Sequence, residues 1–217
     1  MSEAIGTIRS CWPDRWGIPR QPGLAPHAWA ELHLAPHVPL DALRGIEGYS
    51  HLWLITRFHA VSNTRWTGRP PRLGGDRVGV FASRSPHRPS GLGLSLVRLH
   101  GIGERVLLLR DHDLLDGTPV LDIKPYVAWS DVATDPRCGF ADAPPAPRPI
   151  AFDPSAHAIL AGRAELAALI AETVAADPRQ GRPGWGHLQV RVEDVDVHVR
   201  VSGDTLVVER VVPWEAK

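Results

Sequence analysis

Alternate positions carry apolar side chains in the segment Trp29-Ala-Glu-Leu-His-Leu34. A period of two residues is typical of a β-strand with one buried face. Similar alternating or apolar runs recur on both sides of this segment, and Gly and Pro separate them at turn spacing. The other strand candidates are residues 5–11, 51–58, 77–82, 94–99, 105–110 and 119–123.

This series of short strands predicts the fold class. Many short strands at even spacing favour a mainly β protein with a small closed or nearly closed β-barrel over a βαβ sheet. A short helix near residues 40–44 is the one expected exception. We therefore expect residues 1–130 to form the barrel.

The remaining residues have a different pattern. Residues 131–150 are rich in proline, which removes backbone donors and favours an extended linker. An alanine-rich helix is expected over residues 156–176, and strands are expected over 188–192, 195–201 and 206–212 with a hairpin turn at Ser202-Gly203-Asp204. Residues 151–217 are thus expected to form a small α+β unit.

Composition excludes several classes of protein. The chain has 217 residues and a formal net charge of zero, and no apolar run approaches the length of about 18 residues that spans a bilayer. The first residues lack the basic region and apolar run of a signal peptide. Cys11 and Cys138 stand apart without a CxxC pair. We expect a cytoplasmic protein without a membrane segment.

Charge is unevenly distributed along the chain. Residues 57–88 carry seven arginines and two histidines against the single acid Asp76, whereas residues 111–122 carry four aspartates and no Lys or Arg. One basic and one acidic stretch suit a site that handles both an anion and a cation. Two solvated loops of opposite sign would show the same pattern.

Four local sequences combine glycine or proline with polar side chains. They are Pro19-Arg-Gln-Pro-Gly-Leu24, Ser50-His-Leu-Trp-Leu54, Arg84-Ser-Pro-His-Arg-Pro89 and Asp116-Gly-Thr-Pro-Val-Leu-Asp-Ile-Lys-Pro-Tyr126. Each by itself is equally well explained as a rigid connection between strands. Their joint order and spacing carry more information.

Taken in order, and together with Ile5-Gly6 and Ile8-Arg9-Ser10, these sequences resemble the TsaA-like (TrmO) family of tRNA N6-methyltransferases. The resemblance covers most of the expected barrel and returns faintly at Asp177-Pro-Arg179. It implies a small β-barrel that binds S-adenosylmethionine near a homodimer interface. It also implies methylation of N6 of threonylcarbamoyladenosine at position 37, in the anticodon loop of tRNA.

Two departures from the family pattern stand out. The chain has Arg88-Pro-Ser-Gly-Leu-Gly93 where the family usually shows Arg-Pro-Asn-Pro-Ile-Gly, so a glycine turn replaces one stiffened by proline. After Asp177-Pro-Arg179 the chain continues Gln-Gly-Arg182 in place of Pro-x-Tyr. We expect a less preorganised cofactor loop and altered substrate detail.

The resemblance also implies which residues surround the cofactor. These are Pro22, Gly23, Leu24, His59, Arg84, Leu94, Asp113, Leu114, Leu115 and Asp116. S-adenosylmethionine requires apolar walls, a cation for its carboxylate and acceptors near its cationic end, and Arg84 is the expected partner of an anionic group. A histidine that only ends a strand would equally explain His59.

Methyl transfer to N6 is an in-line displacement in which the nitrogen loses a proton. Candidates for the proton acceptor are Asp116, Asp122 and Tyr126. Unstacked anticodon-loop bases stack on aromatic or guanidinium planes. The residues expected to contact tRNA are Arg65, Trp66, Arg69, Arg72, Arg88 and Lys124.

Other functions receive less support. No glycine-rich dinucleotide motif and no P-loop is present, and Ser85 lacks the nucleophile elbow of a hydrolase. His27, His33 and His37 do not complete a metal-ligand set, because Pro36 interrupts the last pair, and no metal is expected. A non-catalytic RNA-binding or ligand-sensing barrel that keeps the cofactor pocket stays open as an alternative.

Overall fold

The computed structural model describes residues 3–70, 76–177 and 185–214. Contacts divide the chain into two compact units. The first unit comprises residues 1–8, 31–109 and 117–144, and the second comprises residues 9–30, 110–116 and 145–217. None of the helices within the described ranges has the length and apolar character that a membrane span requires.

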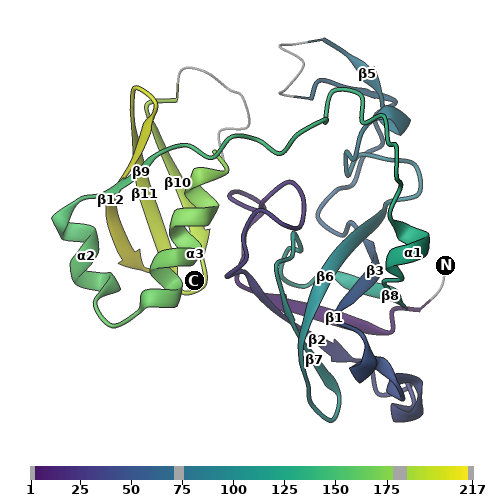
Figure 1. Ribbon diagram of the computed structural model, residues 1–217. Coiled ribbons are helices and arrows are strands. Elements are labelled where there is room, and N and C mark those ends of the chain that lie inside the picture. The colour runs from purple at the N-terminus through teal and green to yellow at the C-terminus, as the bar shows by residue number, and fades with distance from the viewer. Residues whose placement is uncertain (1–2, 71–75, 178–184, 215–217) are drawn as a thin grey trace. The chain divides into compact units, whose positions relative to one another are not determined.

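A closed β-barrel confirms the predicted fold class (Figure 1). Six strands follow one another around it in the order β1-β2-β7-β6-β3-β8. Their bounds are β1 Gly6–Ser10, β2 Trp29–Leu34, β3 His51–Arg57, β6 Leu92–Ile102, β7 Val106–Arg110 and β8 Pro119–Pro125. All six correspond to strand candidates of the sequence.

Alternation along β3 separates the inside of the barrel from the outside. Leu52 and Leu54 are fully buried, whereas Trp53 and Ile55 are only half-buried. Partners across an antiparallel ladder share a face, so the residues paired with Trp53 and Ile55 also point outward. These outward partners are Leu94 and Leu96 on β6 and Asp122 and Lys124 on β8.

The strand expected over residues 77–82 is wrong for most of its length. Only β5, Val78–Gly79, is a strand, and it pairs with β4, Thr67–Gly68, in a separate two-stranded sheet. The 3-10 helix η4, Val80–Ala82, follows at once. The backbone amide of Ser83 donates to the carbonyl of Val80, which closes this turn before a longer ladder can form. Apolar alternation alone does not distinguish such a turn from a strand.

Short helical turns connect the barrel strands. The helix expected near residues 40–44 is confirmed as the 3-10 helix η1, Leu40–Leu43, and a second 3-10 helix, η2, covers Ile46–Gly48. After β8 the chain forms a single helical turn, α1, Ala128–Asp131. The carboxylate of Asp131 accepts hydrogen bonds from the backbone amide of Val127 and from the indole of Trp53, which fixes this turn to β3.

The second unit contains a four-stranded sheet with strand order β10-β11-β12-β9. The bounds are β9 Ile150–Phe152, β10 His187–Val192, β11 Val195–Ser202 and β12 Thr205–Pro213. The last three confirm the expected strands, and Ser202 pairs with Thr205 at the hairpin turn predicted for Ser202-Gly203-Asp204. Strand β9 runs parallel to β12 and was not expected, because three residues that follow a proline-rich stretch give no periodic signal.

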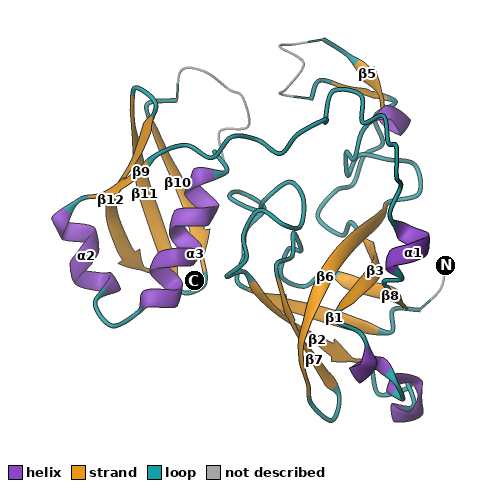
Figure 2. Cartoon of the chain, in the orientation of Figure 1, coloured by secondary structure: helices purple, strands orange, loops and turns teal. Residues whose placement is uncertain are grey.

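Two helices replace the single helix expected over residues 156–176 (Figure 2). They are α2, Pro154–Leu160, and α3, Ala164–Ala175. Gly162 lies between them with φ +79°, and the amide of Arg163 donates to the carbonyl of Leu160. A glycine in the left-handed conformation ends a helix at low energetic cost. The apolar period of the sequence continues past this glycine, although the helical backbone does not.

The segment between β1 and β2 shares the core of the second unit. Cys11, Trp12, Ala25 and Ala28 belong to the same buried cluster as residues of α2, α3 and the sheet. At Gly17, whose φ is +95°, a Cβ atom would lie 3.2 Å from Val190 and 3.3 Å from Thr173. The loop that carries residues 22–24 is therefore held against α3 and β10.

Candidate functional site

The glycine turn of residues 22–24 is tied to the acidic loop after β7. Gly23 has φ +90°, and its backbone amide donates a 2.9 Å hydrogen bond to Oδ1 of Asp111. Among the described residues, no atom lies within 4 Å of the position that a Cβ on Gly23 would take. The turn thus requires glycine for its backbone and leaves open space above it, as suits a backbone that a ligand approaches closely.

Asp111 itself has an uncommon backbone conformation. Its φ is +58°, in the left-handed region that Asp and Asn tolerate better than other side chains with a Cβ. Its amide donates to the carbonyl of Ala28, while its carboxylate accepts from Gly23. Asp111 therefore fastens the acidic loop to both ends of residues 23–28.

The next part of the acidic loop, residues 113–116, is anchored to the end of β1. The hydroxyl of Ser10 donates to the carbonyl of Leu114 at 2.8 Å, and the amide of Ser10 donates to Oδ1 of Asp116 at 2.9 Å. The amide of Asp116 donates to the carbonyl of Trp12 at 3.0 Å. The predicted cofactor residues on this loop thus have a defined backbone.

His112 lies buried beneath this loop. Its Nδ1 accepts a 3.1 Å hydrogen bond from the amide of Leu114, so the ring carries its proton on Nε2, which lies 3.9 Å from the sulfur of Cys11. Burial lowers the pKa of His112 to about 4 and raises the pKa of the Cys11 thiol. Both side chains are uncharged at neutral pH, and the ring packs edge-on against Trp12.

In the first unit, His59 lies beside the residue that follows the acidic loop. A Cβ on Gly117 would lie 3.6 Å from Nε2 of His59. Gly117 has φ +75°, and its amide donates to the carbonyl of Ile8. His59 and Arg84 are both exposed, and Leu94 is 60% exposed on the outer face of β6.

The glycine turn that departs from the family pattern is held by hydrogen bonds. The amide of Gly91 donates to the carbonyl of Arg88 at 3.1 Å, and the carbonyl of Gly91 accepts from the amide of Phe58 at 2.8 Å. A Cβ on Gly93 would lie 2.5 Å from Oγ1 of Thr56, so this position requires glycine. A backbone hydrogen bond to Phe58, the residue that follows β3, thus joins the turn to the barrel in the absence of the second proline.

The residues predicted to contact tRNA differ in their surroundings. Arg65 and Arg69 are exposed, as are Trp66 and Phe81, whose rings meet edge to face at 6.3 Å. Arg88 is directed toward its own loop, where its guanidinium donates to the carbonyls of Ser83 and Ser85. Arg72 lies outside the described residues, and Lys124 is exposed on β8.

The three predicted proton acceptors are also placed differently. Asp122 is exposed on β8, and its Oδ1 accepts from the amide of Ile123 at 2.9 Å. Asp116 is half-buried and already accepts from Ser10. The ring of Tyr126 lies 6.3 Å from those of His51 and Trp53, in an aromatic row on the outside of the barrel.

Residues 7–132 match the family model described as the tRNA-methyltransferase O N-terminal domain. The chain belongs to this family. It is 43% identical over 217 residues to the Escherichia coli tRNA (adenine(37)-N6)-methyltransferase, with 92% of each chain covered. It is also 47% identical over 206 residues to a Pseudomonas aeruginosa protein named as a candidate S-adenosylmethionine-dependent methyltransferase, with 89% of each chain covered.

A solved structure of the tRNA-methyltransferase O family supports the fold along nearly the whole chain. The TrmO structure from Pseudomonas aeruginosa superposes with a TM-score of 0.84 at 40% sequence identity, and the match covers 98% of this chain and 96% of that one. Family membership therefore extends beyond the barrel to the second unit. The resemblance noted in the sequence is confirmed.

Three residues that anchor the candidate cofactor loops had no role in the sequence analysis. Ser10, Asp111 and His112 act through hydrogen bonds to backbone groups that are distant in sequence, or through a ring that faces inward. Ser10 lies within one of the sequences that carry the family resemblance, and Asp111 lies within the acidic stretch. Neither signal indicates which backbone group the side chain meets.

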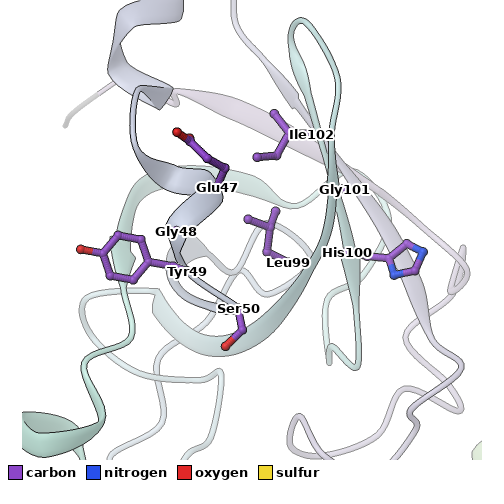
Figure 3. Close-up of a pocket in the computed structure, with 8 residues that line it drawn as sticks. All are labelled: Glu47, Gly48, Tyr49, Ser50, Leu99, His100, Gly101 and Ile102. Atoms are coloured by element: carbon purple, nitrogen blue, oxygen red, sulfur yellow. The ribbon is translucent and has the colours of Figure 1, made fainter.

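A surface hollow on the first unit is lined by different residues. It has a volume of about 480 Å³ and is formed by residues 47–50 and 99–102 (Figure 3). The side chains of Glu47, Leu99 and Ile102 lie toward one another, whereas the rings of Tyr49 and His100 point away. None of the predicted cofactor, catalytic or tRNA-binding residues contributes to its lining.

The histidines considered as metal ligands each lie near a carboxylate of their own. His27 pairs with Glu172 at 2.6 Å, and His33 pairs with Glu31 at 2.8 Å. His37 lies 3.8 Å from Glu3. In the part of the chain that the structure describes, no three His, Cys, Asp or Glu side chains are grouped as metal ligands would be.

Proposed function

We propose that this protein transfers a methyl group from S-adenosylmethionine to N6 of adenosine 37 in tRNA, and that the nucleoside it accepts bears a threonylcarbamoyl group on that nitrogen. The chain is an S-adenosylmethionine-dependent tRNA methyltransferase of its family. The position and atom follow the activity for which the Escherichia coli relative is named. The observation that carries the proposal is the Gly23–Asp111 hydrogen bond, which joins two loops that the family resemblance assigns to the cofactor.

The residues present fit S-adenosylmethionine by their chemistry. In the second unit, the open turn at Gly23 offers a backbone that a ligand can approach, and half-buried Asp113 and Asp116 offer acceptors for hydroxyl groups and for a cationic centre. In the first unit, Leu94 offers apolar surface and Arg84 offers a cation for a carboxylate. We assign the cofactor to these residues, together with Pro22, Leu24, His59, Leu114 and Leu115.

When bound, S-adenosylmethionine supplies an electrophilic methyl group on a sulfonium. A bond from N6 to the methyl carbon would form as the sulfur–carbon bond breaks and S-adenosylhomocysteine leaves, and the proton of N6 would pass to an acceptor of this chain. Residues of the chain align N6 with the methyl carbon and exclude water. An acyl group on N6 makes that nitrogen a weak nucleophile, so proton removal by a placed acceptor contributes directly to the rate.

We assign the acceptor role first to Asp122. Its carboxylate is exposed on the outer face of β8, where Ile55 and Leu94 lie on the neighbouring strands. Asp116 is a second candidate, but its replacement would also remove the anchor to Ser10. Tyr126 is the third, and its phenol can position the substrate or accept through its oxygen.

The tRNA surface is assigned to exposed arginines and aromatic rings of residues 65–70 and 76–81. Arg65 and Arg69 offer charge for phosphates, and Trp66 and Phe81 are 65% and 76% exposed. Bases of an anticodon loop stack on such rings without the cost of opening a duplex. Lys124 and Arg88 complete the proposed set, with Arg88 also ordering its own loop.

We further propose a cytoplasmic homodimer that uses the outer face of the barrel. Leu92 and Leu94 are exposed on β6, and Trp129 is 88% exposed on α1. Large apolar side chains gathered on one face of a soluble protein are typical of an interaction surface. A partner subunit seated there would place its residues next to Leu94, a proposed cofactor residue.

A methyl-transfer assay separates catalysis from the alternative of a non-catalytic binding barrel. The protein is incubated with tRNA and with S-adenosylmethionine that is labelled in the methyl group. The tRNA is then digested to nucleosides, which are identified by mass spectrometry. We expect label in N6-methyl-threonylcarbamoyladenosine. Transfer RNA from cells that cannot form threonylcarbamoyladenosine should give no labelled product at this position. Cofactor binding without any labelled nucleoside would favour the non-catalytic barrel.

A further inference from the structure

Both backbone hydrogen-bonding groups of Leu114 are satisfied by buried side chains. Its carbonyl accepts from the hydroxyl of Ser10 at 2.8 Å, and its amide donates to Nδ1 of His112 at 3.1 Å. The side chain of Leu114 is buried as well. Leu114, at the centre of the acidic loop, is thus held at its carbonyl, at its amide and at its side chain.

Ser10 is placed for this role by a short hydrogen-bond chain. Its hydroxyl accepts from the amide of Trp12 at 3.1 Å while it donates to Leu114, so both functions of the hydroxyl are used. Its own amide donates to the carboxylate of Asp116. One serine at the end of β1 therefore anchors the loop at two points.

His112 can accept from Leu114 only as a neutral ring. A protonated imidazole would present a donor to the amide, and the hydrogen bond would be lost. The ring is 1% exposed, and Trp12 and Cys11 pack against it. The ring also hydrogen-bonds to the backbone of Trp29, and toward the acidic loop it serves as an acceptor.

We propose that Ser10 and His112 are positioning residues for the cofactor, which hold residues 113–116 in the conformation that binds S-adenosylmethionine. Half-buried Asp113 and Leu115 flank the fixed residue, so the direction of both is set by the backbone of Leu114. A loop ordered before binding pays less conformational entropy when the ligand arrives. The inference rests on the proposed assignment of this loop to the cofactor.

Matched variants of His112 separate positioning from simple core packing. His112→Asn keeps an acceptor near the position of Nδ1 but underfills the core, whereas His112→Phe fills the core without an acceptor. By isothermal calorimetry we expect His112→Phe to raise the Kd for S-adenosylmethionine about tenfold and His112→Asn to raise it less than about threefold. Cys11→Ala, which trims the other neighbour of the ring, should leave the Kd within about twofold of wild type.

The inference is supported if His112→Asn keeps the higher affinity for S-adenosylmethionine while His112→Phe keeps the higher free energy of unfolding. Equal Kd values for the two His112 variants, or a loss in Cys11→Ala as large as that in His112→Phe, would overturn it. A wild-type protein that binds neither S-adenosylmethionine nor S-adenosylhomocysteine would overturn the proposed function, and this inference with it.

Amide hydrogen exchange of the free protein gives a second readout that does not depend on the ligand. Ser10→Ala removes the hydroxyl but keeps the backbone amide that bonds Asp116. We expect faster exchange at residues 113–116 in Ser10→Ala, with the exchange of α3 unchanged, and a Kd for S-adenosylmethionine that rises by about fivefold. Wild-type exchange and affinity in Ser10→Ala would refute the role of the hydroxyl, even if the His112 variants did not fold.

Discussion

Asp111 offers the sharpest test of how the two loops proposed for the cofactor are joined, because it combines a side-chain hydrogen bond with a left-handed backbone. Three substitutions separate these two properties. Asp111→Ala removes the acceptor for Gly23. It also places alanine, which tolerates the left-handed region less well than aspartate, at φ +58°. Asp111→Gly loses the acceptor but relieves the backbone. Asp111→Asn keeps both an acceptor and tolerance of this conformation.

The structure sets the expected magnitudes. A partly exposed hydrogen bond to a backbone amide contributes about 1 kcal/mol, and the left-handed conformation costs alanine about 1 kcal/mol more than aspartate. Asp111→Ala should therefore lower the free energy of unfolding by about 2 kcal/mol, Asp111→Gly by at most about 1 kcal/mol, and Asp111→Asn by less than about 0.5 kcal/mol. Urea denaturation followed by fluorescence measures these differences.

Cofactor affinity should follow the hydrogen bond and not the backbone strain. We expect Asp111→Ala and Asp111→Gly both to weaken S-adenosylmethionine binding by about fivefold, which corresponds to about 1 kcal/mol, and Asp111→Asn by less than about twofold. Calorimetry with the cofactor gives these values. Wild-type affinity in Asp111→Gly would refute the reasoning, since the Gly23 turn would then be held without its carboxylate partner.

Further predictions concern pH, the proton acceptor, tRNA and the helix break. Burial lowers the pKa of His112 from 6.5 to about 4, so the unfolded state binds this proton first. The stability from His112 should be complete above pH 6.5 and should fall by about 3 kcal/mol as the pH drops to 4. In His112→Asn the free energy of unfolding should fall less between pH 6.5 and pH 4, as measured by urea titrations at several pH values. Asp122→Asn should reduce turnover at least about tenfold with the cofactor Kd unchanged within about twofold, and equal loss of both would indicate a structural role. Arg65→Glu combined with Arg69→Glu should weaken tRNA binding at least about tenfold by filter binding while cofactor affinity is kept; loss of both would indicate damage to the fold. Gly162→Ala should lower unfolding stability by about 1 kcal/mol, because φ is +79°; an unchanged urea midpoint would contradict this.

Much of the barrel could be predicted because its strands alternate cleanly. Ala30 and Leu32 on β2 and Leu52 and Leu54 on β3 are buried, as a period of two requires. The same reasoning failed for residues 77–82, where a hydrogen bond between Ser83 and Val80 turns the chain after two strand residues. Local pattern does not reveal whether a neighbouring strand is available to continue the ladder.

Glycine positions bear on two further expectations. The apolar period of residues 156–176 continues through Gly162, but the backbone does not, because this glycine adopts a left-handed conformation that ends α2. At Gly91 hydrogen bonds to Arg88 and Phe58 are present in the turn where the family has a second proline, and the lower preorganisation of this loop stays a prediction. In both places the decisive quantity is a backbone angle or a distant partner.

The sequence by itself determined the barrel class and the family, and it indicated the segments proposed for the cofactor, since alternation and motif order are local properties of the chain. Tertiary structure alone decided how those segments are held. Gly23 meets Asp111 and Leu114 meets Ser10 through hydrogen bonds whose partners lie 88 and 104 residues apart. Such pairs arise only when the folded backbone brings a donor to a distant acceptor, and no local pattern records which groups will meet.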